Sequence, residues 1–287
     1  MKTQKAGFTL IELLVVIASI ALVATMLLPA LAQTRPNSRL IQCLANQRQL
    51  AAALIMYAED HRDYLVPNRG LDNQSNLNQP DPRTDPTLQP GGQYSDWCPG
   101  NMQVAACAAR YNLWIQAGLL YPYLKNLSVY RCPADRSMVP RSAPLSLQVP
   151  SWRTYSMNCW VGSVNPQTYA PVPAVGTPGY AVYTKLSDMA RSDPGKTWVF
   201  IEESPICIDD AYFTLNPTTT AFWYNVPAVW HGNASVLAFA DGHADAHRWT
   251  DSNMIYGTGA NPNGDNTPAD SNSPDLAWLI SVSTAHR

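Results

Sequence analysis

The stretch GFTLIELLVVIASIALVATMLLPAL, residues 7–31, decides the class of this protein. From Phe8 to Leu31 it holds roughly 24 residues, which would span about 36 Å as an α-helix. That length exceeds the ~30 Å hydrocarbon core of a bilayer, so we expect residues 8–31 to form a transmembrane helix. Lys2 and Lys5 precede the stretch. Positive residues before a membrane helix favour a cytoplasmic amino terminus, with the rest of the chain outside.

Glu12 is the one charged residue in this apolar stretch. Two ordinary interpretations leave it unexplained: a plain membrane anchor, and a secretory signal peptide cut near the small residues Ala30-Leu31-Ala32. The stretch is also longer than the apolar region of a signal peptide. A carboxylate at the centre of a membrane costs about 2.5–3.5 kcal/mol, less near the end of the helix. Glu12 therefore needs a partner, unless its side chain reaches the lipid head groups.

The string GFTLIE, residues 7–12, resembles the processing site of type IV prepilins and of type II secretion pseudopilins. The resemblance implies that a prepilin peptidase/methyltransferase removes residues 1–7 as a leader, cutting between Gly7 and Phe8, and methylates the new amine to give N-methylphenylalanine. It also implies that Glu12 pairs with the terminal amine of a neighbouring subunit. Phe8 and Glu12 are four residues apart and so share one helix face. The amino end of a helix also favours a carboxylate.

Helical periodicity continues beyond the apolar stretch, with apolar residues on one face and polar residues on the other. We expect one helix from about residue 8 to residue 60, in which residues 32–60 pack against a globular domain. Pro29 and Pro36 are expected to kink or loosen it between its two halves. The apolar positions are Leu40, Cys43, Leu44, Leu50, Leu54 and Tyr57.

Residues 61–287 are expected to form a pilin-like α+β domain outside the membrane, with the long helix packed on a small antiparallel β-sheet. The 24 prolines indicate long irregular loops. Asp241-Gly242 lies between two strand-like runs and predicts a β-hairpin. Other expected elements are a helix at 111–125, strands at 128–132, 153–159, 197–202, 234–240 and 243–249, and a closing helical turn at 274–283.

A second resemblance comes from His231, which is followed by nine residues and then by Asp241-Gly242. This is similar to the H-X9-DG domain of prepilin-type proteins, as are CLANQRQLAAALIMYAED at 43–60, YRCPAD at 130–135 and TYSMN at 154–158. The family has no defined activity, so the resemblance implies a class of protein and not a reaction. It suggests a disulfide between Cys43 and Cys132, and two buried thiols are the alternative. None of the six cysteines forms a CxxC pair.

Three residues near the hairpin are candidate metal ligands. On a strand, His243, Asp245 and His247 would share one face and could hold a divalent ion. The alternative is a solvated outer face, with Ala244 and Ala246 turned inward. For Asp241-Gly242 the structural interpretation is a turn that His231 caps or hydrogen-bonds. A calcium site is a further possibility, although no standard calcium loop occurs. Its oxygen ligands would come from Asp241, Glu202, Glu203, Asp209 and Asp210.

The sequence shows no nucleophile elbow, phosphate loop or dinucleotide fingerprint, so we predict that the chain is not an enzyme. A net charge of −2 gives no indication of nucleic-acid binding. We predict a pilin-like or pseudopilin subunit of a type II secretion or type IV pilus-like system, in the inner membrane. Its partners would be the prepilin peptidase, other pilin-like subunits and membrane lipid. The alternative is an anchored module that binds carbohydrate or a divalent ion without polymerising.

Overall fold

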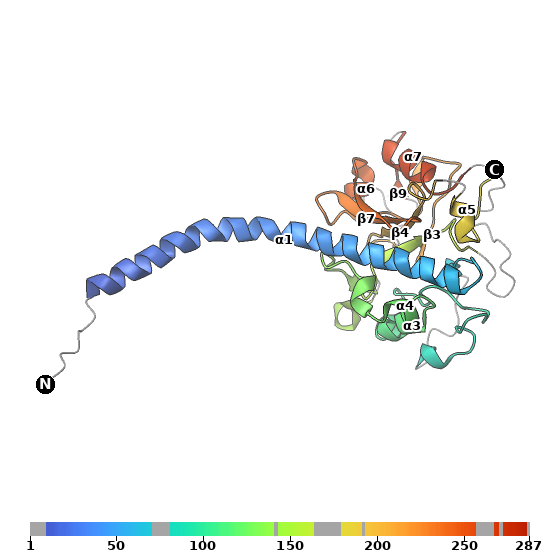
Figure 1. The fold of residues 1–287 in the computed structure, drawn as a ribbon, viewed down its shortest axis with the longest axis horizontal. Helices are drawn as coiled ribbons and strands as arrows, with labels where there is room; N and C mark the ends of the chain where they lie inside the picture. Colours follow the sequence, from blue (N-terminus) through green and yellow to red (C-terminus); the bar gives the residue numbers. More distant parts are fainter. Residues whose placement is uncertain are drawn as a thin grey trace.

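The computed structural model describes residues 10–70, 81–140, 143–163, 179–190, 193–256, 267–269 and 272–285, without the side chains of residues 24 and 26–37. Its dominant element is α1 (Leu10–Asp60), a helix of 51 residues. The helix is not interrupted at Pro29 or Pro36, and the ribbon curves gently instead (Figure 1). A bend can accommodate a proline without ending the helix. Within the part of the chain that the structure describes, no helix combines the length and the apolarity needed to cross a membrane.

The two ends of α1 have different surroundings. Its amino-terminal half projects from the rest of the molecule, and its carboxyl-terminal half lies across the globular domain (Figure 1). In the latter half one face is buried, which confirms the predicted apolar stripe. The buried set includes Cys43, Leu50, Leu54 and Tyr57, with Leu40 and Leu44 partly buried beside it.

The central sheet has the strand order β5-β3-β4-β7-β8. Its strands are β3 (Tyr155–Asn158), β4 (Trp198–Glu202), β5 (Tyr212–Phe213), β7 (Ala234–Phe239) and β8 (Ala244–Arg248). β5 is parallel to β3, and the other neighbours are antiparallel. The α+β, pilin-like class is therefore confirmed, as are the strands expected at 153–159, 197–202, 234–240 and 243–249.

The sheet is a layer between two apolar cores. Side chains alternate along β7, because successive residues of a strand point to opposite faces. Val236 and Ala238 join the core under α1, while Leu237 and Phe239 join the core on the other face. That second face is covered by α6 (Ser252–Tyr256) and α7 (Pro274–Ser281), which fulfils the prediction of a closing helix (Figure 1).

Two local predictions are wrong. The strand expected at 128–132 is the 3₁₀ helix η3 (Leu127–Tyr130), which begins where the Asn126 side chain accepts a hydrogen bond from the Ser128 amide. The helix expected at 111–125 is split into α3 (Tyr111–Ala117) and α4 (Tyr121–Leu124). The break follows from a close backbone approach, because a Cβ on Gly118 would lie 2.3 Å from the Trp97 carbonyl oxygen.

The remaining elements are short and lie within the connecting loops. They are η2 (Pro82–Thr84), α2 (Ala105–Ala108), β1 (Met138–Val139), η4 (Leu145–Leu147), β2 (Val149–Pro150), α5 (Leu186–Ala190), β6 (Phe222–Trp223) and β9 (Thr267–Pro268). β1 pairs with β2, and β6 pairs with β9.

The β7–β8 hairpin closes through Ala240, Asp241 and Gly242. The Phe239 amide donates to the carbonyl of His243 at 2.9 Å, and the Gly242 amide donates to the carbonyl of Phe239 at 3.0 Å. Gly242 has a φ of 92°, a conformation that other residues adopt with strain. Asp241 accepts a hydrogen bond from the His243 amide at 3.0 Å. The predicted hairpin is therefore present, and Asp241-Gly242 forms its turn.

Candidate functional site

Two regions of the chain carry candidate functional side chains, and the first is the amino end of α1. Gly7 and Phe8 lie outside the described residues. Glu12 lies in the first turn of α1 and is exposed. Its neighbours Leu10 and Ile11 are 75% and 73% exposed, and the apolar side chains up to Val23 are exposed as well. An apolar surface of this kind on all sides of a helix requires lipid or other helices to cover it.

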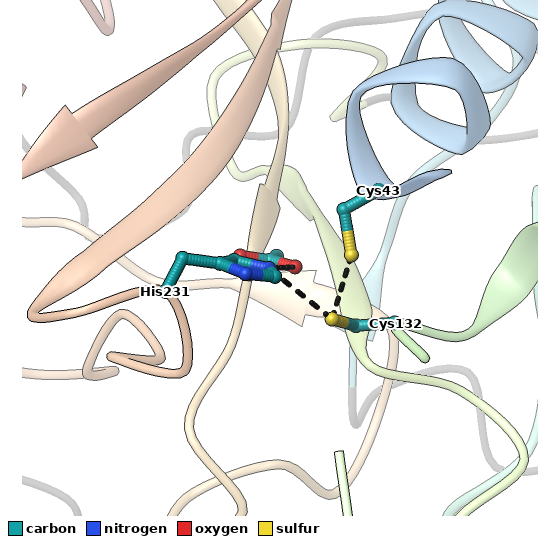
Figure 2. Close-up of side chains that lie close together, drawn as sticks. Cys43, Cys132 and His231 are labelled. Carbon is teal, nitrogen blue, oxygen red and sulfur yellow. Dashed lines mark hydrogen bonds and ion pairs between the residues drawn. The ribbon is translucent and has the colours of Figure 1, made fainter. Parts of the chain in front are cut away.

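The second region is a buried cluster formed by Cys43, Cys132, Glu202 and His231, in which four potential ligand atoms lie within 4.8 Å of one another. The two sulfurs are 2.6 Å apart. The Nε2 atom of His231 lies 3.4 Å from Cys132 Sγ and 3.2 Å from Glu202 Oε1. Figure 2 shows the sulfurs and the imidazole pointing toward one another from separate elements. Among the described residues, this is the group whose geometry could hold a metal ion.

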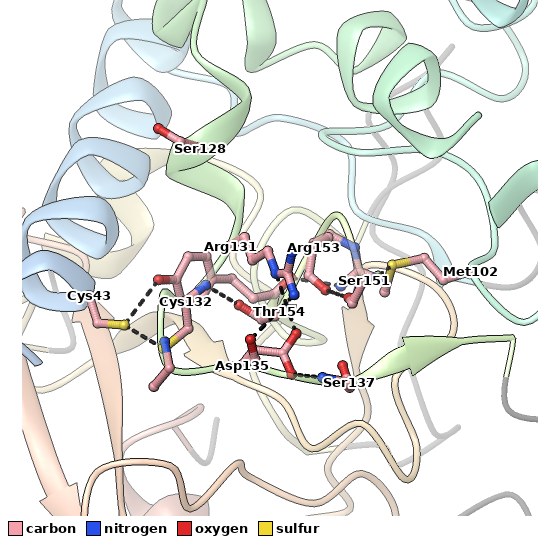
Figure 3. A network of polar contacts seen from close by, with 12 residues as sticks. Cys43, Met102, Ser128, Arg131, Cys132, Asp135, Ser137, Ser151, Arg153 and Thr154 are labelled. Atoms are coloured by element: carbon pink, nitrogen blue, oxygen red, sulfur yellow. Dashed lines mark hydrogen bonds and ion pairs between the residues drawn. The ribbon is translucent and has the colours of Figure 1, made fainter. Parts of the chain in front are cut away.

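Cys132 is held by a turn directly after η3. Its amide donates to Thr154 Oγ1 at 2.6 Å, which joins the turn to the residue before β3. Its sulfur accepts a hydrogen bond from the Ala134 amide at 3.3 Å. Figure 3 shows the contacts behind this turn, where Asp135 accepts from the Ser137 amide. The sulfur therefore has a fixed place beside α1.

His231 reaches the cluster because of a tight turn before β7. Gly232 and Asn233 have φ values of 69° and 63°. Two successive positive φ angles are the pattern of a type I′ turn, which Gly and Asn tolerate. The His231 imidazole, whose side chain is 4% exposed, therefore points back across the sheet toward Glu202.

Glu202 ends β4 and is completely buried. Its Oε2 atom accepts a hydrogen bond from the Val236 amide at 2.8 Å, while Oε1 faces His231. The next residue, Glu203, points elsewhere and accepts a hydrogen bond from Asn225 Nδ2 at 2.6 Å. The two adjacent glutamates therefore belong to separate sites, as the alternation of side chains along a strand predicts.

The cluster strongly shifts proton affinities. Burial lowers the pKa of His231, but the contacts with Cys132 and Glu202 outweigh it and raise that pKa to about 10. Burial raises the pKa of the Cys132 thiol well above its usual range. At Cys43 the hydrogen bond to Cys132 lowers the pKa, while burial and the charge of Glu202 raise it, and the net direction is upward. Without a metal, the cluster therefore favours a protonated His231 next to two neutral thiols.

The expected contact between His231 and the Asp241-Gly242 turn is wrong. The nine intervening residues include β7, so His231 precedes the strand and Asp241 follows it. β4 is antiparallel to β7, which places Glu202 near the start of β7 and Trp198 opposite Phe239 at its end. Asp241 consequently lies at the hairpin tip, at the opposite end of β4 from Glu202. Asp241 is therefore separated from Glu202, with which it would share the expected calcium site, and Glu202 and Glu203 have different partners.

His243, Asp245 and His247 do not converge on one point in the structure. His243 Nδ1 lies 2.6 Å from Asp241 Oδ1, and its ring stacks on Phe239 at 4.3 Å. The ring of His247 stacks on Trp278 at 3.7 Å. Asp245 is exposed. Each of the two imidazoles thus has a contact of its own.

The sequence suggested other roles for Cys43, Cys132 and His231, and a role as calcium ligand for Glu202. All six cysteines are free thiols in the structure, and the disulfide between Cys43 and Cys132 stays a prediction. The ligand spacing offers no local signal, because each member comes from a different part of the chain. Only the fold brings them together.

With the fold and both regions described, the arrangement is that of a pilin-like α+β fold: a long amino-terminal helix packed on an antiparallel-rich sheet. Residues 2–28 match the family model described as "Prokaryotic N-terminal methylation motif". That match suggests a pilin or pseudopilin that is processed by a prepilin peptidase, with a membrane-anchoring amino-terminal helix and a structural, non-enzymatic role. No curated protein and no solved structure gave a match.

Proposed function

We propose that this chain is a pilin-like or pseudopilin subunit that assembles through α1 in a type II secretion or type IV pilus-like system. The observation that carries the proposal is the methylation motif at residues 2–28, which continues into the exposed apolar half of α1. Before assembly, this half lies in the inner membrane, with the globular domain on the periplasmic or extracellular side. After assembly, the same half is covered by the helices of neighbouring subunits.

Glu12 sets the register of this assembly. Cleavage between Gly7 and Phe8 creates an ammonium group four residues before Glu12, a spacing that brings two groups to one face wherever the chain is helical. In a poorly solvated bundle, opposite charges interact more strongly than in water. A neighbouring ammonium therefore offsets the cost of burying the carboxylate of Glu12, and subunits out of register lose that compensation.

Two measurements test the proposal. Mass spectrometry of the protein from its native membranes is expected to show a chain that begins with N-methylated Phe8. Cross-linking of those membranes is expected to give a ladder of multimers, which Glu12→Gln should reduce at least about tenfold, the equivalent of about 1.4 kcal/mol per contact. Glu59→Gln is the matched control, because Glu59 is an exposed glutamate on the part of α1 that packs on the domain. An unchanged ladder in Glu12→Gln would contradict the pairing, and a chain that begins with Met1 would contradict the processing.

A second candidate function is a membrane-anchored binding module that does not polymerise. A hollow of about 240 Å³ favours it, located between the end of α1 and the α3–α4 region. Aromatic, cationic and amide side chains line the hollow, a combination suited to carbohydrate. They include Tyr57, His61, Arg83, Gln116 and Tyr123. Monomers in the cross-linking experiment, together with binding of oligosaccharides by the wild type, would favour this function over assembly.

A further inference from the structure

Four electron-pair donors of the buried cluster lie within 4.8 Å of one another. Two are sulfurs, one is an imidazole nitrogen and one is a carboxylate oxygen. The single proton of His231 Nε2 can be directed to Glu202 or to Cys132, but not fully to both, although both lie within 3.4 Å. A cation at the centre would satisfy all four donors at once. We propose that Cys43, Cys132, Glu202 and His231 form a zinc site that fastens α1 to the sheet.

The distances are close to those of a tetrahedral site. Zinc–ligand bonds of ~2.0–2.3 Å place neighbouring ligand atoms about 3.3–3.8 Å apart. The separations of 3.4 Å from His231 Nε2 to Cys132 Sγ and 3.2 Å from His231 Nε2 to Glu202 Oε1 fit this range within about 0.2 Å. The sulfurs, 2.6 Å apart, must separate by about 1 Å to bind the ion. That change requires a movement of at least one of the two cysteine side chains.

The surrounding fold supports each anionic ligand with a hydrogen-bond donor. Such donors orient the ligands of a metal and stabilise their negative charge. The Ala134 amide donates to Cys132 Sγ at 3.3 Å, the Tyr155 hydroxyl donates to Cys43 Sγ at 3.5 Å, and the Val236 amide donates to Glu202 Oε2 at 2.8 Å. The carboxylate thus keeps Oε1 for the ion.

The chemistry of the ligands selects the metal. Thiolate and imidazole favour zinc over calcium or magnesium, which prefer oxygen ligands. Binding of Zn²⁺ displaces the thiol protons of Cys43 and Cys132 and the Nε2 proton of His231. Two thiolates and one carboxylate then face the doubly charged ion, which leaves one excess negative charge for the nearby amides to stabilise. Four protein ligands leave no position for water, which is typical of a structural site.

A disulfide between Cys43 and Cys132 would use the same sulfurs and exclude the metal. The zinc site gives a role to all four side chains, whereas a disulfide involves only the two cysteines. The inference is also independent of the proposed function, because the ligands lie in the globular half of the molecule. Absence of zinc would therefore not contradict assembly through α1, and failure to assemble would not contradict the zinc site.

Metal analysis of the full chain, extracted from membranes in detergent, tests the site. We expect about one zinc ion per chain. After unfolding in a chelator, all six cysteines should react as thiols. Cys132→Ser and His231→Gln should each lower the zinc content at least about tenfold. Cys159→Ser is the control and should retain zinc, because Cys159 is a buried thiol in the opposite core.

A variant that fails to fold would also lose zinc, so spectroscopy of the wild type provides a test that needs no variant. Replacement of zinc by Co²⁺ is expected to give a thiolate-to-cobalt charge-transfer band and the visible bands of a tetrahedral ion. Chain without metal that yields only four reactive thiols would show the disulfide and overturn the proposal. Absence of the cobalt bands, or full zinc retention in both ligand variants, would overturn it as well.

Discussion

At the scale of single residues, a buried charged side chain, Arg153, fixes the backbone around it by hydrogen bonds. Arg153 is fully buried, and its guanidinium donates to the carbonyl of Tyr155 and to Ser156 Oγ, each at 2.7 Å. These contacts hold the segment that carries Thr154, whose hydroxyl accepts from the Cys132 amide. Because a buried charge is costly unless it is hydrogen-bonded, the segment has few alternative conformations. Arg153 therefore helps to place Cys132 without touching its sulfur.

His247 predicts a dependence of stability on pH. Burial lowers its pKa, against the opposite effects of Asp275 and Asp245, and its ring stacks on Trp278. The folded state thus favours the neutral imidazole, whereas the unfolded chain takes up a proton near pH 6.5. The contribution to stability is present above about pH 6.5 and is lost as the pH falls through the lowered folded pKa.

Denaturant unfolding of the wild type and of His247→Gln checks this expectation. The free energy of unfolding of the wild type should fall relative to that of the variant between about pH 6.5 and pH 5. The difference between the two proteins is the quantity to measure, because the other titrating groups are common to both. A difference that stays constant over this range would contradict the assignment of the effect to His247.

At the scale of elements, core and surface positions lie within a few residues of each other along α1. Leu54 is completely buried under the sheet, whereas Met56 on the same helix is 47% exposed. Leu54→Ala should lower the free energy of unfolding by about 2–5 kcal/mol, because it removes packed methyl groups and leaves a cavity. Met56→Ala is the matched control and should change it by less than about 0.5 kcal/mol. Equal effects in a denaturant titration would show that this turn of α1 is not docked as the structure has it.

Elements that depend on local signals could be predicted from the sequence, and elements that depend on distant contacts could not. The stripe from Leu40 to Tyr57 and the hairpin at Asp241-Gly242 are local signals, because periodicity and turn chemistry operate over a few residues. In the η3 segment two signals conflict: Val129 and Tyr130 favour a strand, whereas the cap from Asn126 favours the helical turn that forms. The split between α3 and α4 depends on Trp97, which is distant in sequence.

The buried cluster could not be predicted, because its members are distant from one another in the sequence. Its four side chains come from α1, from the turn after η3, from the end of β4 and from the turn before β7. Only the order of strands in the sheet places Glu202 beside Val236 and His231. The sequence indicated that His231 and Asp241 belong to one motif, but it did not show that a whole strand separates them.

At the scale of the whole molecule, α1 serves two environments. Its described residues from Leu10 to Val23 are exposed, while the core begins at Leu40 and Cys43. Among the described side chains of α1, those that pack on the globular domain lie in its second half, and the projecting half remains available for lipid or for neighbouring subunits (Figure 1). This division predicts that folding and assembly can be separated by truncation.

A chain that comprises residues 38–287 is expected to fold and to remain monomeric. It keeps the buried residues of α1 from Cys43 onward and loses the exposed apolar half. Size-exclusion chromatography and a cooperative thermal transition check both expectations. A chain of residues 52–287 is the matched comparison: it also lacks Cys43 and Leu50, both completely buried, and should lose the cooperative transition because the sheet face under α1 becomes exposed. If the 38–287 chain fails to fold, or if the 52–287 chain folds equally well, the docked half of α1 is not the part that completes the core.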